Sequence, residues 1–437
     1  MRLLQLTAGS GSFFCGTCLR DAALVQELRA LGHDALLAPL YLPLVLEDGL
    51  DTRPVRMGGL NVWLAHGGRL RVPRFVQDWL DSPRLLAWVA RRGEMTQASQ
   101  LGEMTVAMLR GEQGGQEREI EKLCGWLETL PRPEVVVLSN ALLLGLVQPL
   151  REALGVPILC TLQGEAPFLD ALPEPHRTEA WRLASAHART IEGFLAVSAY
   201  TGELMRERLG LEAERVHVVH NGLDARPYAP PASFDGPPTI GFVARLHRDK
   251  GLGALIDAFL ELKRRPEHAA LRLLAAGATL KSDRPHVAAW RARLEKAGLA
   301  GSFELHSNVS FAEKLEVLRR STVFSVPAGY GESFGLYLLE AWAMGLPVVQ
   351  PSHAAFPELL EATGGGLLYP PDDPAALARG LHELLVDRAR ARALGEHGRR
   401  AVLERFSGAR MAREVERVCR MAAAPAPAGA ISSPTSS

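Results

Sequence analysis

The segment 323–349 constrains the fold most, because it contains a complete strand, loop, helix and second strand. Val323–Pro327 is a short apolar run of the kind that forms a buried parallel strand. Two glycines then interrupt the chain, and good helix formers fill Phe334–Met344. The string GLPVV at 345–349 ends the helix and begins the next strand. A unit of this kind predicts an α/β domain with a parallel sheet.

Similar apolar runs recur along the whole chain, separated by segments with helical patterning. The expected strands lie at residues 2–8, 34–38, 135–138, 157–161, 194–197, 216–219, 239–243, 271–275 and 303–305. Strands that alternate with helices predict mostly parallel sheets. Because 437 residues exceed what one hydrophobic core usually serves, we predict two domains, each a Rossmann-like, doubly wound parallel sheet.

The domain boundaries follow from a change in composition. Residues 227–238 are rich in proline and lack periodicity, which is typical of a linker. We therefore expect an N-terminal domain over 1–226 and a C-terminal domain over 239–395. A helical segment at 396–420 ends the folded chain, and the Ala-, Pro- and Ser-rich residues 421–437 are expected to be disordered.

The composition excludes several classes of protein. Lys plus Arg and Asp plus Glu are equal at 49 each, so the charge gives no support to a nucleic-acid partner. Five cysteines, an odd number, argue against a disulfide framework and indicate a reducing compartment. The first apolar run is too short for a signal peptide, and the sequence shows no membrane-length apolar stretch. We therefore expect a cytoplasmic protein.

An arginine-rich segment at 69–92 allows two interpretations. Its aromatic and aliphatic residues alternate with arginines, and such a basic amphipathic segment can lie on an anionic membrane or bind a lipid-linked substrate. The other interpretation is a pair of core-facing helices whose arginines are solvated. We favour the second interpretation and keep peripheral membrane contact through 69–92 as the alternative.

Two carboxylates, eight positions apart, mark the unit at 323–349. Glu332 lies in its loop, at the carboxyl end of a strand, where open α/β sheets bind ligands, and Glu340 lies in its helix. Alone, such a pair is explained as well by one solvated and one capping glutamate. The whole string, with ESFG at 332–335, Glu340-Ala341 and GLPVV at 345–349, resembles the E-x7-E signature of retaining glycosyltransferases of the family 4 type.

This resemblance implies a GT-B fold, in which the two domains face a cleft and the last helix, here at 396–420, packs back on the first domain. It also implies a retaining, hexosyltransferase-type enzyme that moves a sugar from a nucleotide diphosphate sugar to an acceptor. Glu332 would contact the transferred sugar beside the anomeric carbon, and Glu340 would accept hydrogen bonds from the ribose. The amides of Phe334, Gly335 and Leu336 would approach the diphosphate and the sugar. The acceptor, whether a glycan, a lipid-linked molecule or a small molecule, stays unidentified.

Four further residues belong to the expected donor site. Arg245 and Lys250 flank the first turn of the second domain, and two fixed cations there suit a departing diphosphate, although solvated turn residues are the alternative. They match the family's Arg and Lys that hold the diphosphate, so we expect neither a metal nor another cofactor. Gly11 and Ser12 lie in the glycine-containing loop after the first strand and would close over the phosphates from the facing domain.

Two features depart from the family pattern. Gln163, which we also expect in the donor site, stands at a strand end where many members carry a histidine. Glutamine can donate a hydrogen bond to a sugar or phosphate but cannot carry charge. Cys15 and Cys18, at the start of the first helix, resemble a redox motif, although they are explained as well by residues that only line the cleft. Three alternatives stay open: a sugar-nucleotide epimerase on the same fold, a thiol-disulfide protein using these cysteines, and a nucleotide-sugar-binding protein without turnover.

The segment His220–Asp224 closes the first half of the chain. It resembles the family's domain-junction motif, although a simple Asn-Gly turn explains it equally well.

Overall fold

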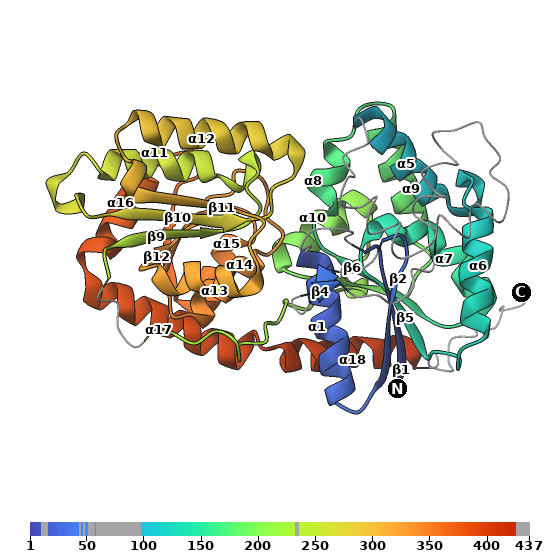
Figure 1. The fold of residues 1–437 in the computed structure, drawn as a ribbon. Coiled ribbons are helices and arrows are strands. Elements are labelled where there is room, and N and C mark those ends of the chain that lie inside the picture. The colour runs from blue at the N-terminus through green and yellow to red at the C-terminus, as the bar shows by residue number, and fades with distance from the viewer. Residues whose placement is uncertain are drawn as a thin grey trace, which may run out of the picture.

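The computed structural model describes residues 1–9, 16–42, 45–46, 49–50, 57, 98–231 and 236–424, which form two α/β domains side by side (Figure 1). The expectations for Gly11, Ser12, Cys15 and segment 69–92 lie outside these residues.

The N-terminal domain is built on a six-stranded sheet in the order β2-β1-β5-β6-β7-β8, and each neighbouring pair is parallel. Its strands are β1 (Arg2–Thr7), β2 (Asp34–Pro39), β5 (Val135–Leu138), β6 (Ile158–Leu162), β7 (Gly193–Ala196) and β8 (Val216–Val218). β5 and β6 are buried along their whole length, as central parallel strands between helical layers should be. A short antiparallel pair, β3 (Val45–Leu46) and β4 (Gly49–Leu50), lies outside this sheet.

Helices cover the sheet on both faces (Figure 1). The helices formed by this part of the chain are α1 (Gly16–Ala30), α5 (Ala98–Arg110), α6 (Glu117–Glu128), α7 (Val147–Leu154), α8 (Glu165–Asp170), α9 (His176–Ala188) and α10 (Ala199–Leu209). No helix in the part of the chain that the structure describes is long and apolar enough to cross a membrane.

The C-terminal domain repeats the design with a sheet in the order β11-β10-β9-β12-β13-β14, again parallel throughout. Its strands are β9 (Thr239–Val243), β10 (Arg272–Gly277), β11 (Phe303–Ser307), β12 (Val323–Phe324), β13 (Val348–Pro351) and β14 (Gly366–Tyr369). Its helices are α11 (Leu252–Leu262), α12 (Arg284–Lys296), α13 (Phe311–Arg320), α14 (Leu336–Ala343), α15 (Phe356–Thr363), α16 (Pro374–Val386) and α17 (Arg388–Arg405). The predicted pair of doubly wound parallel sheets is therefore confirmed.

β12 is shorter than the apolar run at 323–327 led us to expect, since it ends at Phe324. The N–H of Ser325 still donates to the carbonyl of Gly241 in β9 at 3.0 Å. The N–H of Val326 donates instead to the side-chain Oε1 of Gln350 at 3.1 Å, and Pro327 has no N–H to donate. The chain therefore turns away from the sheet early and forms the long loop that carries Glu332.

The two domains are joined by two chain crossings that lie against each other. The N–H of Leu223 donates to the carbonyl of Phe406 at 2.8 Å. A Cβ at Gly222 would overlap the carbonyl of Ser407, so this close approach requires glycine. The segment His220–Asp224 therefore lies at the domain junction.

The single terminal helix expected at 396–420 is wrong, because the structure has two helices, α17 and α18 (Gly408–Ala423). The break falls at Phe406 and Ser407, where the Ser407 side chain accepts a hydrogen bond from the N–H of Arg410 and caps α18. Since α18 continues to Ala423, the expected start of the tail at 421 is also wrong. Residues 425–437 lie outside the described part.

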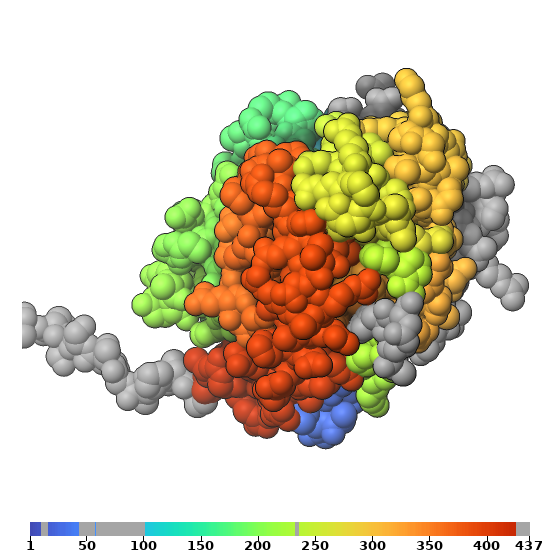
Figure 2. Space-filling model, turned by 90° about the vertical axis from the view of Figure 1, so that its left-hand side faces the viewer, coloured from blue at the N-terminus to red at the C-terminus, as the bar shows by residue number. Residues whose placement is uncertain are grey.

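The last helix returns to the first domain, as the resemblance implied. Met411, Val415 and Cys419 of α18 are buried together with Leu24 and Leu28 of α1. Figure 1 shows α17 along the C-terminal domain and α18 continuing beneath the N-terminal one. In Figure 2, the red surface of the last helices reaches the blue N-terminal residues at the lower edge.

Candidate active site

The candidate site lies where the strand order of the C-terminal sheet reverses. β9 and β12 are neighbours in the sheet although they are far apart in the chain, and open α/β sheets bind ligands at the carboxyl ends of such strands. The loop after β9 carries Arg245 and Lys250, and the loop after β12 carries Glu332. That second loop ends at Gly335, whose φ of 89° is accessible to glycine, and α14 begins at the next residue.

Glu332 is buried, and one of its carboxylate oxygens faces three hydrogen-bond donors. Its Oε2 lies 2.5 Å from Nζ of Lys250, and accepts hydrogen bonds from the hydroxyls of Tyr330 at 2.9 Å and Tyr337 at 3.0 Å. The Lys250 ammonium also lies over the rings of Tyr330 and Tyr337, at 4.9 and 5.4 Å from their centroids. The carboxylate is therefore fixed in orientation, and its nearest charge is a cation.

These contacts keep Glu332 ionised. Burial raises its pKa, but the charge of Lys250 and the hydrogen bonds from Lys250, Tyr330 and Tyr337 outweigh burial, so the pKa lies below the ordinary value. Burial, followed by the nearby Glu332 charge, raises the pKa of both phenols, so they remain donors at neutral pH. The site thus presents a fixed negative charge with neutral phenols beside it.

Arg245 takes a different partner from Lys250. Its Nε and Nη2 lie 3.1 and 3.3 Å from the carboxylate of Asp283, which precedes α12, while 38% of the Arg245 side chain stays exposed. Its charge also acts on Tyr330 and opposes the rise in that phenol's pKa that burial causes. The structure therefore brings both predicted cations to the carboxyl end of β9, each opposite a carboxylate.

Glu340 lies in α14 and is also tied down. Its Oε1 accepts hydrogen bonds from Nζ of Lys314 at 2.7 Å and from the hydroxyl of Tyr228 at 3.0 Å. Lys314 belongs to α13 and lies over the ring of Phe311, 4.6 Å from its centroid. The carboxylate predicted to accept from a ribose is thus positioned by a lysine and a linker tyrosine.

The N-terminal domain faces this site closely. A Cβ placed on Gly16, at the start of α1, would lie 3.7 Å from Cδ1 of Leu336, at the start of α14. A Cβ on Gly164 would lie 3.9 Å from Oγ of Ser333. The starts of α1 and α14 therefore meet across the domain boundary, with Phe334, Gly335 and Leu336 on the C-terminal side.

Gln163 lies at the carboxyl end of β6, next to Gly164, and is buried. Its side-chain Nε2 donates to the carbonyl of Ser139 at 2.7 Å, and its backbone N–H donates to Oε2 of Glu165 at 2.6 Å. Burial raises the pKa of Glu165 despite backbone hydrogen bonds that lower it. One N–H of the Gln163 amide is thus used within the protein, which leaves its second N–H and its oxygen for other partners.

Comparison with known proteins agrees with this geometry. The model of the family described as "Glycosyl transferase 4-like domain" matches residues 20–222, and that of "Glycosyl transferases group 1" matches residues 229–401. The two matches divide at the linker and together cover both domains. The chain belongs to the family 4 type of glycosyltransferases.

The individual relatives share less than a third of their aligned residues with this chain. The alpha-maltose-1-phosphate synthase of Mycolicibacterium smegmatis is 28% identical over 315 residues, which cover 66% of this chain and 79% of the relative. An exopolysaccharide phosphotransferase of Streptomyces coelicolor is 31% identical over 210 residues, 48% of this chain, but the match spans only 21% of that protein's length. The crystal structure of HepE from Anabaena in complex with UDP has a TM-score of 0.69 at 16% identity, covering 96% of this chain and all of HepE, and it shows the same GT-B fold.

Several site residues of this glycosyltransferase were not singled out from its sequence. Tyr337 lies within the signature string, five positions after Glu332. The one signal for it in the sequence was a phenol so close along the chain to a carboxylate predicted to be catalytic. Tyr330 lies in the same loop. Lys314 and Tyr228 lie 26 and 112 residues before Glu340, and no local pattern links them to it.

Of the two cysteines in the redox-like motif, the structure describes only Cys18. Cys18 is 2% exposed, and its sulfur lies 3.8 Å from Oγ1 of Thr7 in the core between β1 and α1. Cys160 and Cys419 are buried as predicted, and Cys124 is half-buried rather than a full core residue. Cys15 lies outside the described part, and Cys18 lies within the core rather than lining an open cleft.

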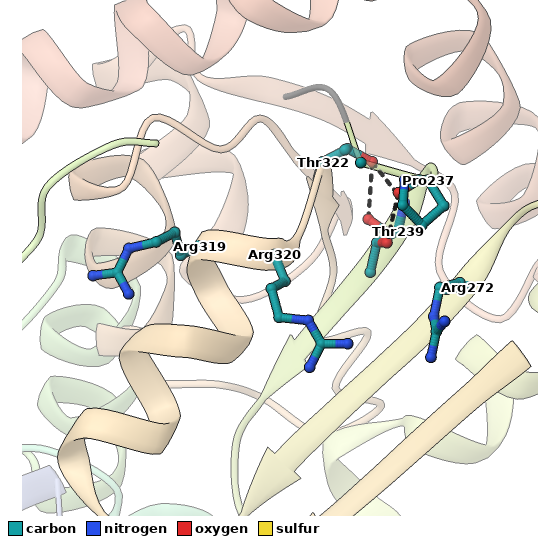
Figure 3. Close-up of a pocket in the computed structure, with 7 residues that line it drawn as sticks. Pro237, Thr239, Arg272, Arg319, Arg320 and Thr322 are labelled. Atoms are coloured by element: carbon teal, nitrogen blue, oxygen red, sulfur yellow. Dashed lines mark hydrogen bonds between the residues drawn. The ribbon is translucent and has the colours of Figure 1, made fainter. Parts of the chain in front are cut away.

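A separate pocket of about 360 Å³ lies at the amino ends of the strands of the C-terminal sheet, opposite the candidate active site (Figure 3). Thr239 and Arg272, at the starts of β9 and β10, line it together with Arg320, and both arginines bind Glu304, Arg272 at 2.8 Å and Arg320 at 2.6 Å. Because this pocket is at the amino ends of the strands, it is not part of the candidate active site.

Proposed function

We propose that this glycosyltransferase transfers a sugar from a nucleoside diphosphate sugar to an acceptor hydroxyl, with retention of anomeric configuration and without a metal ion. The observation that carries the proposal is the placement of Lys250 beside Glu332 at the reversal point of the sheet, with Arg245 on the same loop. Crystal structures of HepE contain UDP, UDP with glucose, or UDP-glucose, which supports a nucleotide-sugar donor for this fold.

The cations would stabilise the leaving group. As the bond between the anomeric carbon and the diphosphate oxygen breaks, negative charge grows on the diphosphate, and Arg245 and Lys250 are preorganised donors for it. The acceptor oxygen then bonds to the anomeric carbon, and its proton passes to the departing phosphate oxygen. This role of two fixed cations would make a metal ion unnecessary.

Glu332 would act at the sugar. Its ionised carboxylate complements the positive charge that develops at the anomeric carbon, and the hydroxyls of Tyr330 and Tyr337 hold that carboxylate in one orientation. From the facing N-terminal domain, the side-chain oxygen of Gln163 would accept a hydrogen bond from a hydroxyl of the sugar. The epimerase and thiol-disulfide alternatives are not favoured, because both halves of the chain match transferase family models and Cys18 is buried.

A panel of UDP-, GDP-, ADP- and CDP-sugars tests the donor class by thermal shift. A ligand that binds only the folded state stabilises it by about 2.7 kcal/mol at a concentration of 100 Kd, so one nucleotide series should raise Tm clearly. The anomeric configuration of the product, read by NMR, then tests retention. If no nucleotide sugar raises Tm, the proposed donor class is wrong.

A further inference from the structure

The first turn of α10, in the N-terminal domain, contacts the backbone on both sides of Glu332. The hydroxyls of Ser198 and Thr201 donate to the carbonyl of Ser333, at 2.7 and 3.0 Å. A Cβ at Gly331 would overlap the hydroxyl of Tyr200, so that phenol lies directly against Gly331. One domain therefore contacts the residues immediately before and after Glu332 in the other.

Glu358 of α15 anchors this turn of α10. Its carboxylate accepts hydrogen bonds from the N–H of Ala199 at 2.9 Å and from the N–H of Tyr200 at 3.3 Å. Both N–H groups belong to the first turn of a helix, where the helix dipole favours a negative charge. Nε2 of His220, at the domain junction, lies 2.6 Å from the same carboxylate.

The anchor and the catalytic loop also meet within the C-terminal domain. The N–H of Ala355, just before α15, lies 3.3 Å from the carbonyl of Glu332. Nε2 of His353 is 2.9 Å from the carbonyl of Ala328, at the other end of the loop. The start of α15 thus supports the loop from one side, and Glu358 holds α10 against it from the other.

We propose that Glu358 is a positioning residue that latches α10 onto the loop of Glu332, so that the loop takes its reactive geometry only when the two domains are in contact. The proposal rests on the function proposed above, since it assigns Glu358 to the same reaction. Among the residues the structure describes, no hydrogen bond or ion pair joins Glu358 to Lys250 or to the Glu332 side chain. Its effect therefore passes through α10 and the carbonyl of Ser333.

Glu358→Gln tests the latch directly. The substitution keeps the size of the side chain but places an amide NH2 where the carboxylate accepted from backbone N–H groups and His220. With UDP-glucose as the donor probe, kcat should fall by about tenfold or more, the effect of losing one charge-assisted hydrogen bond, while calorimetric binding of UDP stays within about twofold. Glu361→Gln, at an exposed position of the same helix, should leave both unchanged.

A second variant weakens the contact between α10 and Ser333 without touching α15. Thr201→Val deletes one hydroxyl that donates to Ser333 while keeping the side-chain shape, and should lower kcat with UDP binding preserved. If UDP binding falls in step with kcat in Glu358→Gln, Glu358 merely supports the C-terminal fold and the latch is overturned. Wild-type kcat in both variants would overturn it as well.

Small-angle scattering needs no donor and separates the two proposals. Without ligand, Glu358→Gln should have a larger radius of gyration than the wild type and Glu361→Gln, because the domains are released. An unchanged radius of gyration would overturn the latch. A larger radius in a chain that binds no nucleotide sugar would retain the latch and defeat the proposed donor class.

Discussion

Nζ of Lys250 and Oε2 of Glu332 lie 2.5 Å apart, and this ion pair joins the loops that follow β9 and β12. The two residues are 82 positions apart in the chain. Removing one partner of such a pair leaves the charge of the other uncompensated. Each variant tested below therefore uses a substitution of similar shape or a control substitution at a neighbouring residue.

Glu332→Gln should lower kcat much more than it weakens nucleotide binding. The amide cannot carry the negative charge that complements the transition state, and we expect a loss on the order of 100-fold in kcat. Steady-state kinetics and calorimetry with UDP measure the two effects separately. Equal losses in both, or no loss in kcat, would place Glu332 away from the reacting sugar.

Lys250→Ala and Arg245→Ala should each lower kcat/KM. The loss should correspond to a few kcal/mol of transition-state stabilisation, about the value of one preorganised donor at a developing anion. Arg248 lies on the same turn with 72% of its side chain exposed, so Arg248→Ala is the matched control and should retain activity. Full activity in both test variants would defeat the diphosphate role.

Transfer should survive prolonged treatment with EDTA, because Arg245 and Lys250 are expected to take the place of a metal at the diphosphate. Activity is compared before and after chelation, and again after Mg²⁺ or Mn²⁺ is added back. Abolition by the chelator with recovery on adding metal would show that a metal ion takes part.

A Cys15→Ser, Cys18→Ser double variant should keep donor binding and most transfer activity under reducing conditions. Cys18 is buried 3.8 Å from Oγ1 of Thr7, where a serine hydroxyl can still find a polar neighbour. Melting temperature and UDP binding control for folding. Loss of transfer with both intact would give the cysteines a role in the reaction.

Glu304 should make the C-terminal domain sensitive to acid. The hydrogen bonds of Arg320, opposed by burial and assisted by His306 and Arg272, lower the pKa of Glu304 to about 2. A carboxylate with a depressed pKa stabilises the fold above its unfolded pKa of about 4.3 and loses that contribution as pH falls toward its folded pKa.

Glu304→Gln should therefore reduce the free energy of unfolding by about 1 kcal/mol at pH 7, after allowance for solvent screening. The difference from wild type should shrink as pH falls from about 4.5 toward 2, as urea unfolding at several pH values would measure. Glu316→Gln is the control, because Glu316 pairs with Arg319 at the surface and 52% of its side chain is exposed. A difference that stays constant with pH would contradict this account.

Local patterns in the sequence determined the secondary structure and the class of fold. Short apolar runs such as 135–138 became buried strands, and the alternation with helices produced two parallel sheets. The string from Glu332 to Gly345 also indicated the family, and the two family matches confirmed it. These features depend on residues within one strand or one turn of helix, whose periodicity the sequence displays directly.

Only the tertiary structure decided how the site is assembled. Lys250 meets Glu332, Lys314 meets Glu340, and Ser198 meets Ser333 across 82, 26 and 135 positions. The break at Phe406 likewise depends on Leu223 pairing with that turn. Such contacts arise when loops at the carboxyl ends of neighbouring strands and the two facing domains are brought together by packing, and spacing along the chain contains no measure of that distance.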